Sequence, residues 1–332
     1  MISVVIPLYN KETVIANTLK TVINQQFKDF EVVIVNDGST DDGVSVIKNG
    51  FDDSRIRIIN QANQGAAVAR DRGVQEAKYQ YIAFLDADDE WHPEYLKIMA
   101  DTISKYPDAG LFSSAGLIVD SNGCHYRLAR KYQNYIGKVD WMEAPFVFTH
   151  TSGTIINRHV FDCTKGSPVG MRCLQDFALF MQIALRSDVV YVGLPISKYV
   201  GGVPGQTTSA DPEKRYRLLE YVCYFYSMAY KEWVDLGKKN KKFLTYHKYI
   251  VRNVCKNLIK VDERSINYFI DHLSAEAKQP LFSFEWVLYR SKYKKIAIFW
   301  INITKAMWRL YGYPVGGEKV DINMIPSKYR TW

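Results

Sequence analysis

The chain has 332 residues, of which 47% are hydrophobic and 23% charged, and its formal net charge is +8. This composition is typical of a folded globular protein with a core of ample size, and it excludes a low-complexity or disordered chain. The five cysteines form no CxxC pair, so they offer no zinc-site spacing and indicate reduced thiols in a cytosolic compartment. Met1 runs directly into an apolar strand, so we expect no signal peptide. No apolar run approaches the roughly 18 residues of a membrane span.

The first hundred residues predict strands that alternate with helices. Strands are expected at 3–9, 31–37, 56–60 and 81–85, and helices at 13–26 and 64–77. Strands joined by crossover helices favour a mostly parallel sheet, in which ligands bind beyond the carboxyl ends of the strands. The ends of three of these strands carry polar residues that should converge at one edge of the sheet: Tyr9-Asn10, Asn36-Asp37, and Asp86 to Asp89.

The stretch "YIAFLDADDE" (81–90) places three carboxylates, Asp86, Asp88 and Asp89, within four positions. Like charges this close repel by about 1 kcal/mol per pair at 4 Å in water, and by more at a lower dielectric. A divalent cation is the simplest partner that would offset this repulsion, because hard cations prefer carboxylate oxygens. The alternative is a solvated turn leading into a helix that starts at His92-Pro93.

The pattern changes after residue 110. Shorter strands are expected at 110–119, 151–158 and 188–195, with a helix at 175–187. The segment 203–215 is rich in Pro, Gly, Ser and Thr and is typical of a linker. Everything after it is helical in pattern, aromatic and basic. We therefore predict two domains, a catalytic α/β domain at 1–210 and a helical C-terminal extension at 211–332.

Four motifs, "VVIPLYNKE", "VIVNDGSTD", "NQGAAVARDRG" and "IAFLDADDEWHPEYL", occur in an order and at a spacing that closely resemble the family 2 inverting glycosyltransferases. The resemblance covers about residues 1–205 and does not reach the C-terminal third. It implies the GT-A fold, a nucleotide-sugar donor that is UDP- or dTDP-linked, and inversion at the sugar. It also implies a divalent metal, Mg²⁺ or Mn²⁺, which would stabilise the diphosphate leaving group as a Lewis acid.

The resemblance assigns roles to residues at the sheet edge. Asp88 resembles the metal ligand, and Asp86 the residue near the ribose and the metal shell. Asp37 resembles the aspartate that recognises the base, with an Asx-turn as the alternative. Pro7 and Tyr9 resemble the wall of the base pocket.

Three further positions belong to the expected nucleotide-sugar site. Glu12 and Ala87 are included in it, although Glu12 can equally be a helix-entry residue. Arg70 matches the arginine that approaches the nucleotide, with a salt bridge between residues 70 and 71 or their neighbours as the alternative.

Asp176 resembles the general base that takes the proton of the acceptor hydroxyl, a task worth about 10²–10⁴-fold in rate. Relatives carry an acidic pair at this helix start, whereas this chain has Gln175 before Asp176. An aspartate that merely caps the helix is the alternative. The segment "KYVGGVPGQTTS" (198–209) has no histidine, so we expect no protein histidine on the metal.

The predicted function is therefore metal-dependent transfer of a sugar to a saccharide or lipid-linked saccharide, as in polysaccharide biosynthesis. A non-catalytic sugar-binding module of the same fold and a nucleotidyltransferase remain open as alternatives. A phosphatase of the haloacid dehalogenase kind fits poorly, because its aspartates belong on the first strand. No nucleic-acid partner is expected.

Aromatic residues stand beside Lys and Arg in two helical candidates of the C-terminal third, 216–233 and 281–311. Two interpretations of them stay open. One is an ordinary helical cap packed on the catalytic domain. The other is a cytoplasmic enzyme that rests on the inner face of the cell membrane, where basic residues are attracted to anionic lipid and Trp and Tyr prefer the interface.

Overall fold

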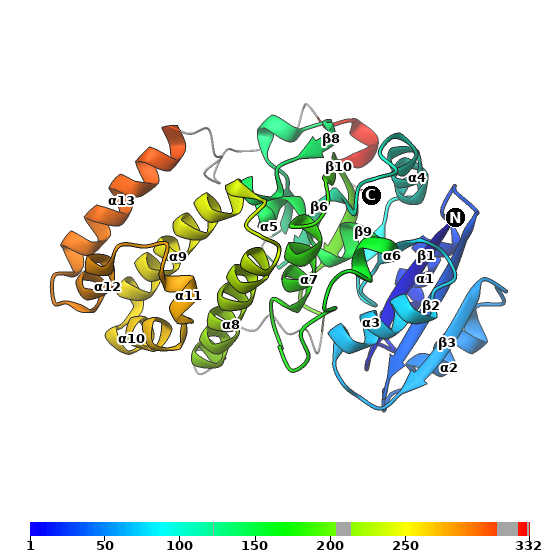
Figure 1. Cartoon of the computed structure of the whole chain (residues 1–332). Helices are drawn as coiled ribbons and strands as arrows, with labels where there is room; N and C mark the ends of the chain where they lie inside the picture. The colour runs from blue at the N-terminus through cyan, green and yellow to red at the C-terminus, as the bar shows by residue number, and fades with distance from the viewer. Residues whose placement is uncertain (122, 204–213, 311–324, 331) are drawn as a thin grey trace. The chain divides into compact units, whose positions relative to one another are not determined.

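The computed structural model describes residues 1–121, 123–203, 214–310, 325–330 and 332 (Figure 1). The chain divides into two compact units. The first unit carries the β-sheet with its helices and the short C-terminal η5 (Ser327–Tyr329), and the second carries α8 to α13. The predicted boundary at residue 210 lies outside the described residues.

The first four strands of the sheet are parallel and lie in the order β3-β2-β1-β4. Their bounds are Ile2–Leu8 (β1), Phe30–Asp37 (β2), Ile56–Gln61 (β3) and Tyr81–Phe84 (β4). The intervening helices are Ile15–Ile23 (α1), Gly43–Gly50 (α2) and Ala66–Glu76 (α3). Every residue of β1 is buried, as expected for a strand that lies between two others in a covered parallel sheet.

The sheet continues from β4 through β9, β6 and β10 to β5. These strands span Glu90–Trp91 (β5), Leu111–Asp120 (β6), Thr154–Asn157 (β9) and Val189–Val200 (β10). β9 is antiparallel to both β4 and β6, and β10 is parallel to β6. Two short strands, Gly123–Arg127 (β7) and Ile136–Val139 (β8), pair antiparallel with β6 and β10. The predicted GT-A class, a mostly parallel central sheet flanked by helices, is confirmed.

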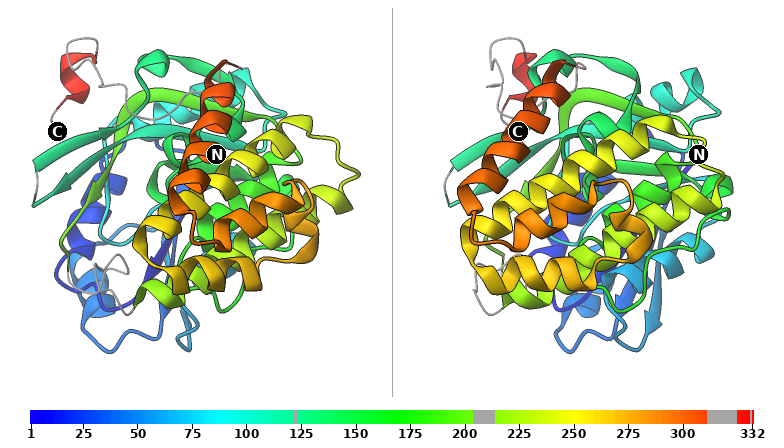
Figure 2. Two further views of the ribbon diagram at one scale, coloured as in Figure 1. Left: turned by 90° about the vertical axis from the view of Figure 1, so that its left-hand side faces the viewer. Right: turned by 60° about the vertical axis from the view of Figure 1, so that its left-hand side comes forward.

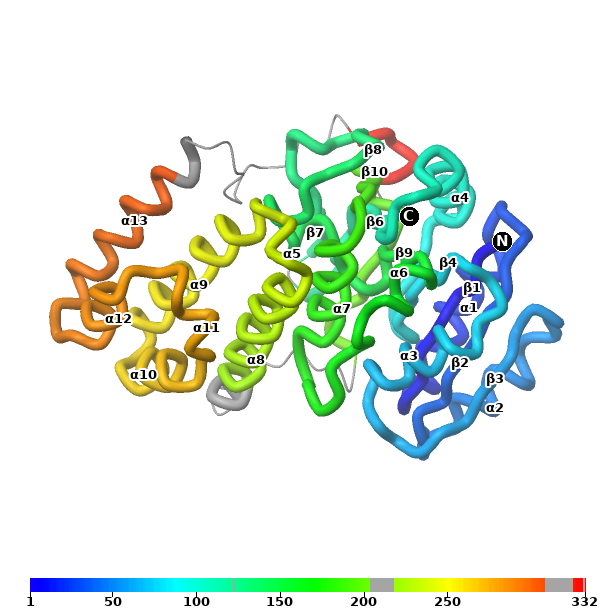
Figure 3. The backbone as a smooth tube through the Cα atoms, in the orientation of Figure 1, coloured from blue at the N-terminus to red at the C-terminus, as the bar shows by residue number. Residues whose placement is uncertain are grey.

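Short helices complete the first unit. Helix α4 (Tyr95–Lys105) begins two residues after Pro93, so the predicted start at His92-Pro93 is slightly early. The remaining elements are η1 (Arg130–Tyr132), η2 (Trp141–Glu143), α5 (Pro145–Phe148), η3 (Thr151–Gly153), α6 (Arg158–Phe161) and α7 (Gln175–Ala184). The tube in Figure 3 traces this unit, with β9, α6 and α7 labelled, and these three elements follow one another along the chain.

The second unit is helical in its described residues (Figure 2). Its helices are Lys214–Asp235 (α8), Lys241–Val261 (α9), Glu263–His272 (α10), Ala275–Lys278 (α11), Ser283–Arg290 (α12) and Lys294–Leu310 (α13). The aromatic core includes Phe225, Tyr226, Phe243 and Phe269. The candidate at 281–311 is thus two helices separated by a break at 291–293. No helix in the described part of the chain is long and apolar enough to cross a membrane.

Candidate active site

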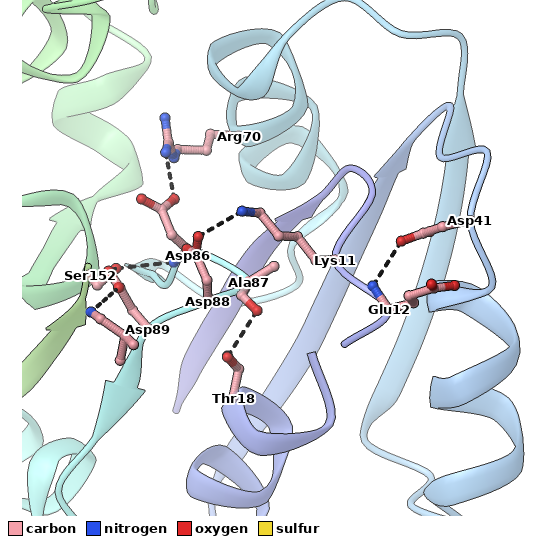
Figure 4. Close-up of polar contacts among 11 residues, drawn as sticks. Lys11, Glu12, Thr18, Asp41, Arg70, Asp86, Ala87, Asp88, Asp89 and Ser152 are labelled. Atoms are coloured by element: carbon pink, nitrogen blue, oxygen red, sulfur yellow. Dashed lines mark hydrogen bonds and ion pairs between the residues drawn. The ribbon is translucent and has the colours of Figure 1, made fainter. Parts of the chain in front are cut away.

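The carboxylates that follow β4 meet two cationic side chains (Figure 4). Arg70 Nη2 donates to Asp86 Oδ1 at 2.5 Å, and Lys11 Nζ donates to Asp88 Oδ2 at 2.8 Å. These two ion pairs supply positive charge that offsets the repulsion between the carboxylates. Sequence reasoning expected a metal ion for this purpose and missed Lys11, because nothing local to "LYNKE" indicates which carboxylate the lysine reaches.

Asp89, the third carboxylate of this loop, is buried. Its carboxylate accepts hydrogen bonds from Ser152 Oγ and from the backbone N–H of Val200 at 3.1 Å. Burial raises the pKa of Asp89 well above its ordinary value, and the charges of Asp86 and Asp88 add to that increase. Asp89 therefore ties the loop after β4 to η3 and β10.

The same loop is held on its other side by α1. The Ala87 carbonyl accepts a hydrogen bond from Thr18 Oγ1 at 3.0 Å, and Ala87 itself is buried (Figure 4). The loop is thus fixed at Ala87 and at Asp89. The side chain of Asp88, between them, is 10% exposed, and that of Asp86 is 30% exposed.

Asp37 lies at the end of β2, next to β1, and is buried. Its carboxylate accepts three hydrogen bonds: one from Gln61 Nε2 at the end of β3, at 2.8 Å, and two from the backbone N–H groups of Gln64 and Gly65, just before α3, at 2.9 and 2.8 Å. The described hydrogen bonds of Asp37 form no Asx-turn, and its neighbour Asn36 accepts a hydrogen bond at Oδ1 from the Ser39 N–H, three residues on, at 3.0 Å. Asp37 thus positions the entry to α3, the helix that carries Arg70.

The other residues expected near the nucleotide lie around the end of β1. Pro7 is within the strand, and Tyr9, just beyond it, is 46% exposed. Glu12 points toward the start of α2, where its Oε2 accepts from the Asp42 N–H at 2.9 Å and its own N–H donates to Asp41 (Figure 4). The described hydrogen bonds of Glu12 are those of a helix-entry residue.

Arg70 is buried and pairs with Asp86, not with its neighbour Asp71. Asp71 accepts hydrogen bonds from the N–H and the hydroxyl of Ser167 at 2.7 and 2.8 Å. The structure therefore has no salt bridge between the described side chains of Arg70 and Asp71. Burial lowers the pKa of Arg70, but the negative charges of Asp86 and Asp176 outweigh burial and hold that pKa above its ordinary value.

Asp176 lies in the first turn of α7. Its Oδ2 accepts a hydrogen bond from Thr151 Oγ1 at 2.9 Å, and its Oδ1 accepts from the N–H of Phe177 at 2.8 Å. Thr151 is followed by Ser152, whose Oγ accepts from the Asp86 N–H at 3.1 Å. Two adjacent residues of η3 therefore connect the carboxylate on α7 with the carboxylate loop after β4.

Two further polar groups lie beside this centre: Arg127, which sequence reasoning did not single out, and Gln175, which it did. Arg127, at the end of β7, has a pKa lowered by burial, against the opposing influence of Asp176 and Asp89. Gln175 Oε1 is buried and has no hydrogen-bond partner in the described structure. Arg127 belongs to a short hairpin that has no strong sequence signal.

Comparison with known proteins identifies the domain that this site belongs to. Residues 3–164 match the family model described as glycosyl transferase family 2. These residues are a family 2 glycosyltransferase domain. The matched region holds every predicted site residue except Asp176.

Individual relatives cover the chain to different extents. The uncharacterized glycosyltransferase YibD of Escherichia coli is 43% identical over 93 residues, which are 28% of this chain and 27% of YibD. The chain thus aligns with about a quarter of that relative's length. In three dimensions, a fragment of Staphylococcus aureus TarS in complex with UDP-GlcNAc is similar with a TM-score of 0.62 and 15% identity, over 96% of this chain and 99% of the fragment. The mannosyltransferase PcManGT of Pyrobaculum calidifontis, in complex with GDP-Man and Mn²⁺, has a TM-score of 0.50 and 16% identity over 94% of this chain and 88% of PcManGT.

Proposed function

We propose that this protein is a metal-dependent, inverting glycosyltransferase that moves a sugar from a UDP-linked donor to a saccharide or lipid-linked saccharide acceptor. One observation carries the proposal: η3 links the carboxylate loop after β4, through Ser152, to Asp176 on α7, through Thr151. A donor's diphosphate beside Asp86 and Asp88 would then place its sugar within reach of a base on α7. The family 2 domain and the UDP-GlcNAc and GDP-Man bound to the structural neighbours support the donor class.

The carboxylate ligands after β4 fit a divalent metal that binds together with a nucleotide. Asp88, with Asp86 beside it, would hold the ion, and Mg²⁺ usually takes only one or two protein carboxylates and completes its shell with phosphate and water. The described residues contain no group of three or more His, Cys, Asp or Glu side chains arranged as a metal cage. Lys11 already places a positive charge on Asp88. When bound, the metal would neutralise charge on the diphosphate leaving group.

The chain's own residues supply the remaining chemistry. Asp176 accepts the proton of the acceptor hydroxyl while that oxygen attacks the anomeric carbon and the bond to the nucleotide diphosphate breaks. Thr151 orients the Asp176 carboxylate, and Arg70 stabilises negative charge beside Asp86. Asp37 fixes the start of α3 and has room for a further hydrogen bond, because a carboxylate has about four acceptor positions and three are used.

The test is a panel of UDP- and dTDP-sugars with Mg²⁺ or Mn²⁺ and candidate acceptors, with nucleotide release as the readout. Asp176→Asn should lower turnover by about 10²-fold or more with little change in donor binding, because only the proton transfer is lost. Asp101→Asn, at an exposed acid on α4, is the matched control and should leave turnover unchanged.

Two outcomes would contradict the proposal. Near wild-type turnover in Asp176→Asn would leave Asp176 as a helix cap and move the base elsewhere. Donor binding without turnover across the panel would favour the non-catalytic sugar-binding module, for which the replacement of the usual acidic residue by Gln175 is the motivating feature. Metal dependence is tested separately with Asp88→Asn, which should weaken binding of UDP–Mn²⁺ in calorimetry.

We further propose that the protein acts in the cytoplasm at the inner face of the cell membrane, where lipid-linked acceptors are presented. This location follows from the lipid-linked acceptor proposed above.

A further inference from the structure

The second unit carries a set of exposed apolar side chains on two consecutive helices. We call it the α12–α13 apolar face. Its members are Phe282, Phe284 and Val287 from the α12 segment and Ile296, Phe299, Ile303 and Met307 from α13. Val287, Phe299 and Phe282 are 71%, 65% and 60% exposed, values that ordinary core residues do not have. Contiguous apolar patches of this kind mark interaction sites.

Helix α13 is apolar on both sides. Its inner side includes Ala297 and Ile301, which are buried. The helix packs on α9 and α12, and Figure 2 shows its ribbon beside theirs. Its outer side should be polar in an ordinary amphipathic helix. Instead the outer positions include Ile296, Phe299 and Ile303, which recur at the three- and four-residue spacing of one helix face.

The two helices present this face as one preformed surface. Phe284 stacks on Phe282 with ring centroids 5.8 Å apart, and it meets Trp300 of α13 edge-on at 5.3 Å. Beneath the face, the buried Glu285 accepts hydrogen bonds from Arg252 of α9 at 2.8 and 2.9 Å and from Trp300 Nε1 at 2.9 Å. This network fixes α12 and α13 on α9.

The charged side chains at the surface of the segment that carries this face are basic, and one of them, Arg290, pairs with Asp271 of α10. Between residues 281 and 307 the basic side chains are Arg290, Lys292, Lys294, Lys295 and Lys305. The single acidic residue of that stretch, Glu285, is buried and paired with Arg252, so it adds no negative charge to the surface. Exposed apolar side chains flanked by lysines match an anionic lipid surface, where each lysine gains about 1 kcal/mol.

We propose that the α12–α13 apolar face docks the protein on an anionic lipid bilayer. The other helical candidate, 216–233, does not share this role. Within α8 the aromatic side chains of Phe225, Tyr226, Tyr230 and Trp233 are buried in the core of the unit. The assignment therefore places membrane contact on α12 and α13. It does not depend on the donor, the metal or the catalytic base.

The test is co-sedimentation of the full chain with vesicles of phosphatidylcholine, with and without a third of phosphatidylserine, at low and high salt. The wild type should bind the anionic vesicles, and more strongly at low salt, where screening is weakest. Ile296→Ser, Phe299→Ser and Ile303→Ser combined should weaken binding by about tenfold or more, since buried apolar area is lost. Lys292→Glu with Lys295→Glu should weaken binding by about fivefold or more for each lysine.

The matched control is Tyr224→Ser with Val234→Ser. It removes two exposed apolar side chains of α8, which are 50% and 38% exposed in the same unit, and it should leave vesicle binding unchanged. Circular dichroism checks that all variants are folded. The proposal is overturned if the wild type fails to bind anionic vesicles at low salt, or if the triple variant binds as the wild type does. It is also overturned if light scattering shows a wild-type dimer that the triple variant turns into monomers, because the face would then join two copies of the chain.

Discussion

Lys11 places a positive charge on one carboxylate of the loop after β4. Its ammonium group lies on Asp88, the residue we propose as the metal ligand, and both side chains are about nine-tenths buried. A lysine in this place competes with a divalent ion for the same oxygen. It would also become available to a phosphate once a metal takes over Asp88. The pair can therefore make metal binding depend on the nucleotide that brings the ion.

Replacing Lys11 should change the affinity for the metal alone. In Lys11→Met, Mn²⁺ should bind about fivefold to tenfold more tightly without nucleotide, because a unit positive charge within about 4 Å costs on the order of 1 kcal/mol or more. Calorimetric titration of Mn²⁺ into the protein measures this change.

Lys198→Met is the control for Lys11→Met. It removes a lysine that pairs with Glu90 at the same 2.8 Å but does not touch Asp88. Equal Mn²⁺ affinity in Lys11→Met and wild type would show that the lysine does not compete for the metal.

At the residue level, sequence reasoning located the carboxylates but not their partners. Asp37, Asp86 and Asp88 follow strands, and strand ends of a parallel sheet are predictable from hydrophobic pattern. The partners come from distant loops: Lys11 lies 77 positions from Asp88, and Ser152 lies 63 from Asp89. Such pairs depend on how the strands are ordered in the sheet, and local pattern does not carry that order.

Helix α3 owes its position to a glycine. A Cβ at Gly73 would lie 2.2 Å from Cγ1 of Val5 on β1, far inside van der Waals contact, so only glycine lets the helix approach the strand this closely. Val5 belongs to a strand that is buried along its whole length and has little freedom to shift. The close approach of α3 also sets where Arg70, one turn earlier, meets Asp86.

Gly73→Ala should therefore destabilise the protein by about 1–3 kcal/mol through overpacking. The matched substitution is Gly50→Ala in α2, where an added Cβ meets nothing within 4 Å. There alanine should be neutral or stabilising by about 0.5–1 kcal/mol, since it restricts the unfolded chain. Thermal unfolding of both variants measures the difference. Equal melting temperatures would show that β1 moves aside at little cost.

At the element level, long periodic segments were the predictable part. The four parallel strands and helices α1 and α3 lie at the predicted positions, with ends shifted by a few residues. The short strands β5, β7 and β8 were missed, because two to five residues carry too little pattern to distinguish a strand from a loop. The break between α12 and α13 was missed as well, since the aromatic and basic pattern continues through Ser291 and Tyr293.

At the scale of the whole chain, each unit contains a buried histidine whose lowered pKa makes it hard to protonate in the folded state. In the second unit His247 of α9 is fully buried, and its Nε2–H donates to the Ala277 carbonyl at 2.8 Å. The rings of Tyr230, Phe243 and Tyr226 surround it, with centroids 4.9, 5.7 and 6.5 Å away. Burial lowers the pKa of His247 to about 4, and in the first unit burial and the charge of Arg127 lower the pKa of His150 to about 3.

Both histidines should make stability fall on mild acidification. The unfolded chain binds a proton near pH 6.5 and the folded chain does not until about pH 4 at His247, so stability is complete above pH 6.5 and declines as the pH falls toward 4. Between pH 7.5 and 5.5 the amides of α9 should lose about 1 kcal/mol of protection in hydrogen exchange, corrected for intrinsic rates, as local opening of this unit becomes easier.

In His247→Gln the side-chain amide can still donate to the Ala277 carbonyl but does not titrate, so the loss of protection should be smaller by about that amount. His272→Gln, at an exposed histidine of the same unit, should behave as the wild type. If His247→Gln lost as much protection as the wild type, another group in the unit would be the one that takes up the proton.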